Sequence, residues 1–290
     1  MDAPAQELLK LLDLEQIDEN TFRGHSPETA GRQVYGGQAV AQALVAVTRT
    51  APTDRPAHSL HAYFVLAGDP RTPIDFAVER IRDGKSFTTR RCVASQRGKT
   101  IFSMEASLQV EEAGLEHGSH MPDVPDPDRL EDIGAIAARF QNFLPAAAQS
   151  WLKRSSALDL RVVAPETMLF PPKSPMATQQ IWFRVLGLLP DDQAIHSALL
   201  AYLSDMTLLN TALLAHGRTI FDSDIQVASL DHALWLHRRF RVDDWLLYAQ
   251  ESPMAAGARA LTRGQIFSRS GQLIASVAQE GLIRLRPSKN

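Results

Sequence analysis

The most apolar part of the chain is a run at residues 193–217, QAIHSALLAYLSDMTLLNTALLAHG. Its apolar positions surround a helix on nearly every side, and such a helix must be covered by other parts of the protein. We expect it to extend over about residues 192–216. Asp191 or Asp192 fits the N-cap position, and Gly217 fits the position just past the end.

A second, uncharged run from Gln33 to Thr48 is opened by Gly36-Gly37 and also predicts a helix. Strand-like segments follow it, separated by turn signals such as Asp83-Gly84, and lie near residues 58–66, 73–82, 85–97 and 99–111. The same order follows the 192–216 helix, with strands expected at 219–227, 229–241, 244–251, 256–268 and 272–285. A helix followed by consecutive strands therefore occurs twice.

The stretch at 113–132, AGLEHGSHMPDVPDPDRLED, is rich in Pro, Gly and acidic residues and predicts a linker. A helical pattern follows it to about residue 154. The expected organisation is a first unit at 1–112, a linker with a helical segment at 113–157, and a second unit at 158–290. Ser59-Leu60 and Ser229-Leu230 are separated by the same number of residues as Gln109 and Gln279. This shared spacing agrees with a duplication of the unit.

These patterns predict an α+β fold in which an antiparallel sheet wraps around a central helix in each of two tandem units. The two sheets can join edge to edge, which would hide strand edges that otherwise promote aggregation.

Charge and cysteine content narrow the function. The net charge of −3 provides no basic field for general nucleic-acid binding. Cys92 is the single cysteine, so a disulfide framework and a Cys-based zinc site are excluded, and we interpret it as a buried small residue in a strand.

The amino-terminal residues lack the basic and apolar regions of a signal peptide, and the spacing of Leu8, Leu11 and Leu12 predicts a short amphipathic helix instead. The residues 288–290, Ser-Lys-Asn, differ from a peroxisomal Ser-Lys-Leu address. Ser, Asp, Thr and Asn interrupt the apolar run, so no membrane span is expected. We expect a soluble, cytoplasmic protein.

Several blocks of the chain together resemble the acyl-CoA thioesterase II family, which has the double hot-dog fold. The resemblance extends from about Leu14 to Arg284 and is carried by GRQVYGGQAVAQAL (31–44), HSLHAYFVLAGDP (58–70), RDGKSFTTRR (82–91), SLDHALWLHR (229–238), DWLLYAQES (244–252) and ASVAQEGLIR (275–284). It implies two hot-dog units in one chain and agrees with the fold predicted from the patterns.

The resemblance also implies a site and a reaction. The family's catalytic Asp, hydroxyl residue and Gln match Asp205, Ser229 and Gln279. Many relatives have Thr at the middle position, and Ser retains the hydroxyl. The implied reaction is hydrolysis of fatty acyl-CoA thioesters without a metal or an organic cofactor. A homodimer or a higher homo-oligomer is expected.

Asp205 is the one carboxylate in the apolar run, and the run contains no Lys or Arg to pair with it. A buried, unpaired carboxylate loses its hydration at a high cost in free energy. On the residues alone, Asp205 either points to solvent or serves a function that requires burial. The resemblance favours the second alternative, in which hydrogen bonds from Ser229 and Gln279 keep the carboxylate ionised and able to act as a base.

Substrate-binding residues are harder to assign. Gly37 opens the first long helix, where free N–H groups could face a carbonyl oxygen, although close packing of helix and sheet explains the glycine equally well. His232 is expected to pack or to hydrogen-bond near the site. His232 and His237 point to opposite faces of a strand, so they are unsuited to share a metal ion.

The segment from 80 to 99 is rich in basic residues. These residues indicate either a solvated strand face or a surface that binds the phosphates of coenzyme A. The candidates are Arg80, Arg82, Lys85, Arg90, Arg91, Arg97 and Lys99, with Arg259 and Arg263 in the second half. Arg90 and Arg91 are the leading pair, and strand alternation predicts that only one of them faces a ligand.

Two other functions stay open. A hot-dog enoyl-CoA hydratase would need an Asp and a His near the double bond, and Asp231 beside His232 is a poor match because neighbours on a strand diverge. A non-catalytic acyl-CoA binding module would need neither Asp205 nor Gln279.

Overall fold

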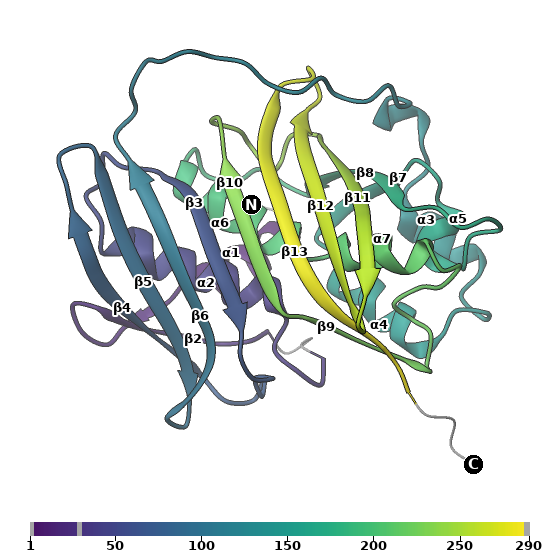
Figure 1. Ribbon diagram of the computed structural model, residues 1–290, viewed down its shortest axis with the longest axis horizontal. Helices are drawn as coiled ribbons and strands as arrows, with labels where there is room; N and C mark the ends of the chain where they lie inside the picture. Colours follow the sequence, from purple (N-terminus) through teal and green to yellow (C-terminus); the bar gives the residue numbers. More distant parts are fainter. Residues whose placement is uncertain (1–2, 28–30, 287–290) are drawn as a thin grey trace.

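The computed structural model describes residues 3–27 and 31–286. Within them, antiparallel strands form one 13-stranded sheet, and the helices α2 (Gly36–Arg49) and α6 (Gln193–Ser204) pack against each other (Figure 1). The predicted α+β class is confirmed. Residues 288–290, which differ from a peroxisomal address, lie outside the described part of the chain.

The first unit and the linker contain short helices at the amino terminus and in the expected helical segment before residue 154. Their bounds are α1 (Ala3–Leu12), β1 (Glu15–Gln16), β2 (Thr21–Gly24), α2, β3 (Ala57–Phe64), β4 (Ile74–Asp83), β5 (Phe87–Gln96), β6 (Lys99–Gln109), η1 (Pro127–Arg129), α3 (Ile133–Arg139) and α4 (Ala146–Arg154). The amphipathic helix predicted from the amino-terminal leucines is confirmed as α1, whose Leu8, Leu11 and Leu12 are buried.

The second unit repeats this plan. Its elements are β7 (Leu158–Val162), α5 (Glu166–Leu169), β8 (Thr178–Val185), α6, α7 (Leu208–Leu214), β9 (Ile225–Ser229), β10 (Asp231–Leu236), β11 (Leu246–Ala256), β12 (Arg259–Ser268) and β13 (Leu273–Leu285). Two strands precede the central helix in each unit, and the remaining strands follow it.

The two units meet at the centre of the sheet. The strand order is β1-β2-β4-β5-β6-β3-β10-β13-β12-β11-β8-β7, with β9 also paired to β13. The expected junction of the two sheets is the antiparallel pair β3–β10, in which Leu60 lies opposite Leu234. Both of these leucines are buried, so the junction continues the apolar core from one unit into the other.

The four strands β1, β2, β7 and β8 were missed by the sequence patterns. β1 and β2 are only 2 and 4 residues long, which is too short for a periodicity of two to stand out. The strand expected at 219–227 was wrong at its start, because Thr219 and Asp222 hydrogen-bond each other at 2.9 Å in a turn and pairing begins at Ile225.

The apolarity of the longest helical run is explained by packing. The segment Gln193–Leu214 is long and apolar enough to cross a membrane by length and composition, yet 89% of its 18-residue apolar window is buried inside the protein. Cys92 is also fully buried, in β5, and burial raises the pKa of its thiol, which confirms its interpretation as a core residue.

The linker connects the units along a path beyond the ends of the strands (Figure 1). Figure 1 shows the segment after β6 crossing from the first unit to the helices of the second. It is fixed there by the Trp182 indole N–H, which donates to the Pro125 carbonyl at 3.0 Å, and by an ion pair between Arg269 and Asp126 at 2.8 Å.

Candidate active site

The long helix predicted over 192–216 is broken in the middle, at Asp205. α6 ends at Ser204, Asp205 is its C-cap, and α7 begins at Leu208. The break turns the Asp205 carboxylate toward the start of α2, where a Cβ atom on Gly36 would lie 2.6 Å from Asp205 Oδ2. The carboxylate therefore occupies the place where the end of one central helix meets the beginning of the other.

Asp205, Ser229 and Gln279 come together around this carboxylate. The Ser229 hydroxyl donates to Asp205 Oδ1 at 3.1 Å, and Gln279 Nε2 donates to the same oxygen at 2.6 Å. Gln279 Nε2 also lies 2.7 Å from Ser229 Oγ. Ser229 ends β9 and Gln279 lies on its partner β13, so strand pairing holds the hydroxyl and the amide beside the helix break.

Burial dominates the electrostatics of Asp205. The residue is 9% exposed, and loss of hydration raises the pKa of its carboxyl group above the ordinary value. Hydrogen bonds from Gln279 and Ser229 and the nearby Gly37 N–H oppose this shift. A carboxylate with a raised pKa and fixed hydrogen-bond donors is suited to accept a proton from water.

Gly37 lies beside the Asp205 carboxylate, and its N–H helps to lower the pKa of that carboxyl group. A Cβ atom at Gly37 would overlap the Tyr202 carbonyl oxygen. The packing explanation for this glycine therefore holds, because α2 and α6 approach through their backbones at this point.

Three tyrosines surround the carboxylate, and the sequence patterns gave no signal for any of them. The Tyr35 hydroxyl donates to the Tyr202 carbonyl at 2.9 Å, and the Tyr248 hydroxyl donates to the Ser204 carbonyl at the same distance. The Tyr35 and Tyr202 rings meet edge to face at 4.9 Å. These hydroxyls satisfy backbone carbonyls at the end of α6, where a helix leaves such groups unpaired.

His232 lies close to the site, as expected. It is 1% exposed, and its Nε2 lies 2.8 Å from Ser204 Oγ. His237 instead contacts Ser276 on the other face of β10, so the two histidines are separated by the sheet. Among residues 3–27 and 31–286, no group of three His, Cys, Asp or Glu side chains is arranged to hold a metal ion.

Comparison with known proteins identifies the family. Residues 157–282 match the profile of the acyl-CoA thioesterases, and residues 25–109 match the profile of the acyl-CoA thioesterase N-terminal domain. The chain is 42% identical over 277 residues to acyl-CoA thioesterase 2 of Haemophilus influenzae, with 96% of each chain covered. It is 37% identical over 290 residues to human acyl-coenzyme A thioesterase 8, covering 96% of this chain and 88% of that protein.

Solved structures agree with the sequence comparison. The crystal structure of an acyl-CoA thioesterase II from Mycobacterium marinum matches with a TM-score of 0.81 and 42% identity, covering 98% of this chain and 100% of that one. The chain belongs to the acyl-CoA thioesterase II family. A hot-dog protein from Alicyclobacillus acidocaldarius, at 17% identity and a TM-score of 0.76, shares the fold of this family.

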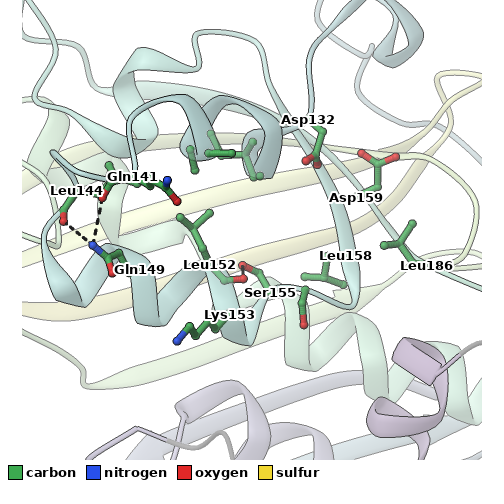
Figure 2. A pocket seen from close by; sticks show the side chains of 15 residues that line it. Asp132, Gln141, Leu144, Gln149, Leu152, Lys153, Ser155, Leu158, Asp159 and Leu186 are labelled. Carbon is green, nitrogen blue, oxygen red and sulfur yellow. Dashed lines mark hydrogen bonds between the residues drawn. The ribbon is translucent and has the colours of Figure 1, made fainter.

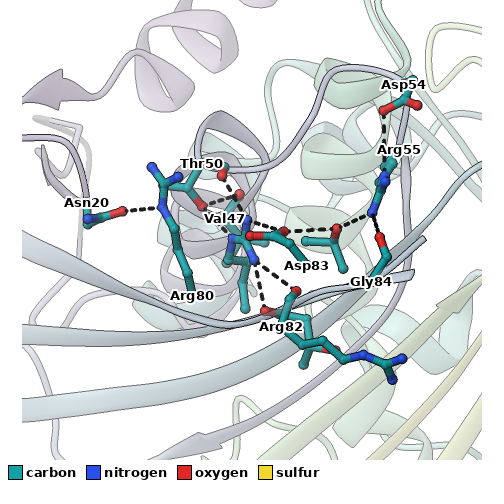
Figure 3. Close-up of polar contacts among 12 residues, drawn as sticks. Asn20, Val47, Thr50, Asp54, Arg55, Arg80, Arg82, Asp83 and Gly84 are labelled. Atoms are coloured by element: carbon teal, nitrogen blue, oxygen red, sulfur yellow. Dashed lines mark hydrogen bonds and ion pairs between the residues drawn. The ribbon is translucent and has the colours of Figure 1, made fainter. Parts of the chain in front are cut away.

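In this member of the family, Arg90 is not on the surface. It is 1% exposed, and its guanidinium donates to the Thr50 carbonyl at 3.0 Å and to Asp83 Oδ1 at 2.7 Å. Figure 3 shows these polar contacts around Thr50, Arg82 and Asp83. Thr50 follows the last residue of α2, where a cation is favourable, so Arg90 caps this helix and is the member of the Arg90–Arg91 pair that does not face the surface.

Arg91 points to the outer face of the sheet, as alternation from Arg90 requires. Its side chain is 48% exposed and lies 3.9 Å from Glu79. Arg259 and Arg263 similarly pair with Glu280 and Glu251, each at 3.0 Å. These three arginines are therefore solvated and ion-paired, and their contact with coenzyme A phosphates stays a prediction.

Open pockets of the described chain lie away from Asp205. One of about 590 Å³ lies between α3, α4 and the start of β7, where Leu144, Leu152 and Leu158 line it (Figure 2). Another of about 1470 Å³ lies at the far end of α2, beside residues 52–57. Neither pocket is lined by the Asp205 cluster. Within that cluster Ser229 is partly exposed, so solvent approaches the carboxylate from its side.

Proposed function

We propose that this chain hydrolyses fatty acyl-CoA thioesters to a free fatty acid and coenzyme A, using Asp205, Ser229 and Gln279. The observation that carries this proposal is the buried Asp205 carboxylate with two fixed donors on one oxygen, in a chain of the acyl-CoA thioesterase II family. Such an arrangement can hold and deprotonate one water molecule.

In the proposed reaction, Asp205 takes a proton from water while the water oxygen attacks the thioester carbonyl carbon. A C–O bond forms, the C–S bond breaks, and the proton held by Asp205 passes to the departing thiolate. Ser229 and Gln279 orient the water, since each lies within 3.1 Å of the Asp205 carboxylate. No metal or organic cofactor is required for these steps.

A covalent serine route is less well supported. Ser229 donates its hydroxyl proton to Asp205, and the nearby imidazole of His232 contacts Ser204 rather than Ser229. Ser229 therefore lacks the adjacent imidazole base that activates a serine nucleophile.

The hydratase alternative is disfavoured by side-chain directions. Asp231 Oδ1 accepts the Glu280 N–H at 2.6 Å, while His232 is buried on the opposite side of β10. The pair cannot act together on one double bond. A pure binding module is disfavoured because a buried carboxylate costs free energy without aiding the packing of the fold.

The test is Asp205→Asn, which keeps the shape and removes the base. We expect kcat to fall about a hundredfold or more while acyl-CoA still binds. Release of coenzyme A from substrates of short to long acyl chain, followed with a thiol reagent, measures this effect and the chain-length preference. Asp231→Asn is the matched control and should retain most of the activity.

Turnover in heavy-oxygen water distinguishes direct attack from a covalent route. Direct attack places the label in the fatty acid without forming an acylated protein, whereas an acyl-Ser229 route labels the fatty acid only after the protein has been acylated. An acylated protein by intact mass, or label appearing first in Asp205, would contradict the proposed mechanism.

Assembly as a homodimer or a higher homo-oligomer and a cytoplasmic location are also proposed. Light scattering coupled to size-exclusion chromatography tests the first, and imaging of the tagged full-length chain tests the second. A monomer at micromolar concentration would contradict the proposed assembly.

A further inference from the structure

Two buried polar atoms beside the Asp205 cluster lack a hydrogen-bond partner among the described residues. They are Gln279 Oε1 and His232 Nδ1. Gln279 is 0% and His232 is 1% exposed, so water at the protein surface cannot hydrogen-bond to either atom. Buried polar atoms without partners are rare in folded proteins, and an unpaired acceptor beside an unpaired ring nitrogen therefore calls for an explanation.

Strand pairing brings the two side chains together. β10 and β13 pair with Ala233 opposite Ala278, and the same register continued by one residue sets His232 opposite Gln279. Both side chains are buried and therefore point to the helix-covered face. Residues opposite each other on antiparallel strands have Cβ atoms about 4.5–5.5 Å apart, which is within reach of a hydrogen bond between these side chains.

The orientation of the Gln279 amide is fixed by its other contacts. An ionised carboxylate only accepts hydrogen bonds, so the amide nitrogen must face Asp205 Oδ1, 2.6 Å away. The nitrogen also serves Ser229 Oγ at 2.7 Å. The amide oxygen consequently points away from the carboxylate and needs a donor of its own.

The imidazole of His232 can supply that donor. Burial lowers the pKa of His232, so the ring is neutral and carries one N–H. Ser204 Oγ lies 2.8 Å from His232 Nε2 and can donate its hydroxyl proton there, or donate to the Ala201 carbonyl at 3.0 Å. Only the tautomer with the proton on Nδ1 also satisfies Gln279 Oε1.

We propose that His232 is a positioning residue for the reaction, in which its Nδ1–H donates to Gln279 Oε1 and holds the amide nitrogen on Asp205 and Ser229. This inference rests on the proposed hydrolytic function. Without the His232 donor, the Gln279 side-chain amide can flip, which would place its oxygen against the Asp205 carboxylate. The water would then lose an aligned base, so the loss should fall on kcat and leave KM nearly unchanged.

Two substitutions of similar polarity test the role. His232→Asn keeps an N–H donor near the Nδ1 position, whereas His232→Gln places one near the Nε2 position, toward Ser204. We expect His232→Gln to lower kcat about tenfold or more and His232→Asn to stay within about threefold of the wild-type chain. A role limited to packing against Ser204 predicts the reverse order, and equal kcat values for the two variants would also overturn the proposal.

A double substitution checks that His232 acts through Gln279. Adding His232→Gln to Gln279→Ala should produce no further loss of kcat, because the amide that His232 holds is already absent. If the kcat losses of the two single variants instead multiply in the double variant, His232 acts independently of Gln279 and the positioning role is refuted. Thermal unfolding of each variant reports whether the fold is retained.

The tautomer can be measured in the wild-type chain without any substitution. Long-range ¹H–¹⁵N correlation spectra distinguish the two neutral tautomers, and we expect the proton of His232 on Nδ1. A proton on Nε2 would overturn the proposal even if acyl-CoA hydrolysis is observed. Absence of hydrolysis by the wild-type chain would instead refute the proposed function, so the two failures are distinguishable.

Discussion

At the scale of single residues, the buried charge of Asp205 that suits the proposed reaction lowers the stability of the fold. Its folded-state pKa is raised, mainly by burial, above the value in an unfolded chain. A group with a raised pKa binds protons more tightly in the native state, so its contribution to the free energy of unfolding falls as pH rises. At neutral pH the ionised carboxylate therefore lowers stability, and the hydrogen bonds from Gln279 and Ser229 offset only part of that cost.

Because the ionised Asp205 carboxylate lowers stability at neutral pH, Asp205→Asn should change both stability and its dependence on pH. The neutral variant should have a higher Tm than the wild-type chain at pH 7, because it buries no charge. The difference should shrink as pH falls through the raised pKa of Asp205, since the wild-type carboxyl becomes protonated. Calorimetry over a pH series measures this, and a lower Tm for the variant at pH 7 would contradict the dominance of burial. The kcat/KM of the wild-type chain should decline on the acidic side over the same range.

Arg90 and Arg91 are adjacent in sequence but should respond differently to alanine. Arg90→Ala leaves the Thr50 carbonyl and Asp83 without their partner, and we expect the free energy of unfolding to fall by about 2 kcal/mol or more. Arg91→Ala removes a half-exposed charge beside Glu79, and the expected change is below about 1 kcal/mol. Denaturant titration of both variants compares them. Equal losses would show that Arg90 is not a structural cap.

At the scale of elements, the site depends on the close approach of α2 and α6. Gly36 and Gly37 begin α2, and the carbonyl of Tyr202 and the carboxylate of Asp205 lie where their side chains would otherwise be. The end of α6 and the beginning of α2 thus form one structural unit, although 167 positions separate the hydrogen-bonded Tyr35 and Tyr202. The positive end of α2 also favours the nearby negative charge.

Alanine substitutions at the two glycines should separate folding from catalysis. Gly37→Ala forces a Cβ against the Tyr202 backbone carbonyl, and we expect a loss of about 2 kcal/mol or more in stability. Gly36→Ala places its methyl group 2.6 Å from Asp205 Oδ2, where a side chain can yield, so kcat should fall about tenfold with a smaller loss of stability. Unfolding curves and steady-state kinetics on both variants provide the comparison. A stable, fully active Gly37→Ala chain would refute the close backbone contact.

At the scale of the whole molecule, the units share a sheet and a core. The β3–β10 pair joins them, and α2 packs on α6 across the same boundary. Each unit alone would expose a long strand edge and the apolar side of its central helix. The linker contacts the second unit through Glu116, Ser119, Pro125 and Asp126, whereas Leu115 is fully exposed, so the chain can be opened at Leu115.

Cutting the chain at Leu115, which is fully exposed, should leave the two pieces associated. A protease site inserted after Gly114 allows the cut, and size-exclusion chromatography of the product should show one species with both fragments. Residues 115–290 expressed alone should aggregate or bind the other fragment, because the β10 edge is open. A soluble, monomeric and cooperatively folded 115–290 fragment would contradict a merged core.

The sequence by itself determined the order of the main elements and the family. Apolar periodicity marked both central helices, and turn residues such as Asp83-Gly84 marked the strands that follow them. These features are local, because the buried face of a helix or strand produces a periodic pattern of apolar residues within a few positions. The blocks that resemble the family also pointed to Asp205, Ser229 and Gln279 as one site, and the structure places these three side chains in contact.

Only the tertiary structure decided how those residues meet. The Gln279–Asp205 hydrogen bond spans 74 positions and depends on strand register and on the break after Ser204, neither of which has a local periodic signal. The inward direction of Arg90 depends on its finding Thr50 at the end of α2, and the juxtaposition of His232 with Gln279 depends on the pairing of β10 with β13. Burial of a polar side chain is stable only where a distant partner satisfies it, so the environment of each of these groups is a property of the packed molecule rather than of its own segment.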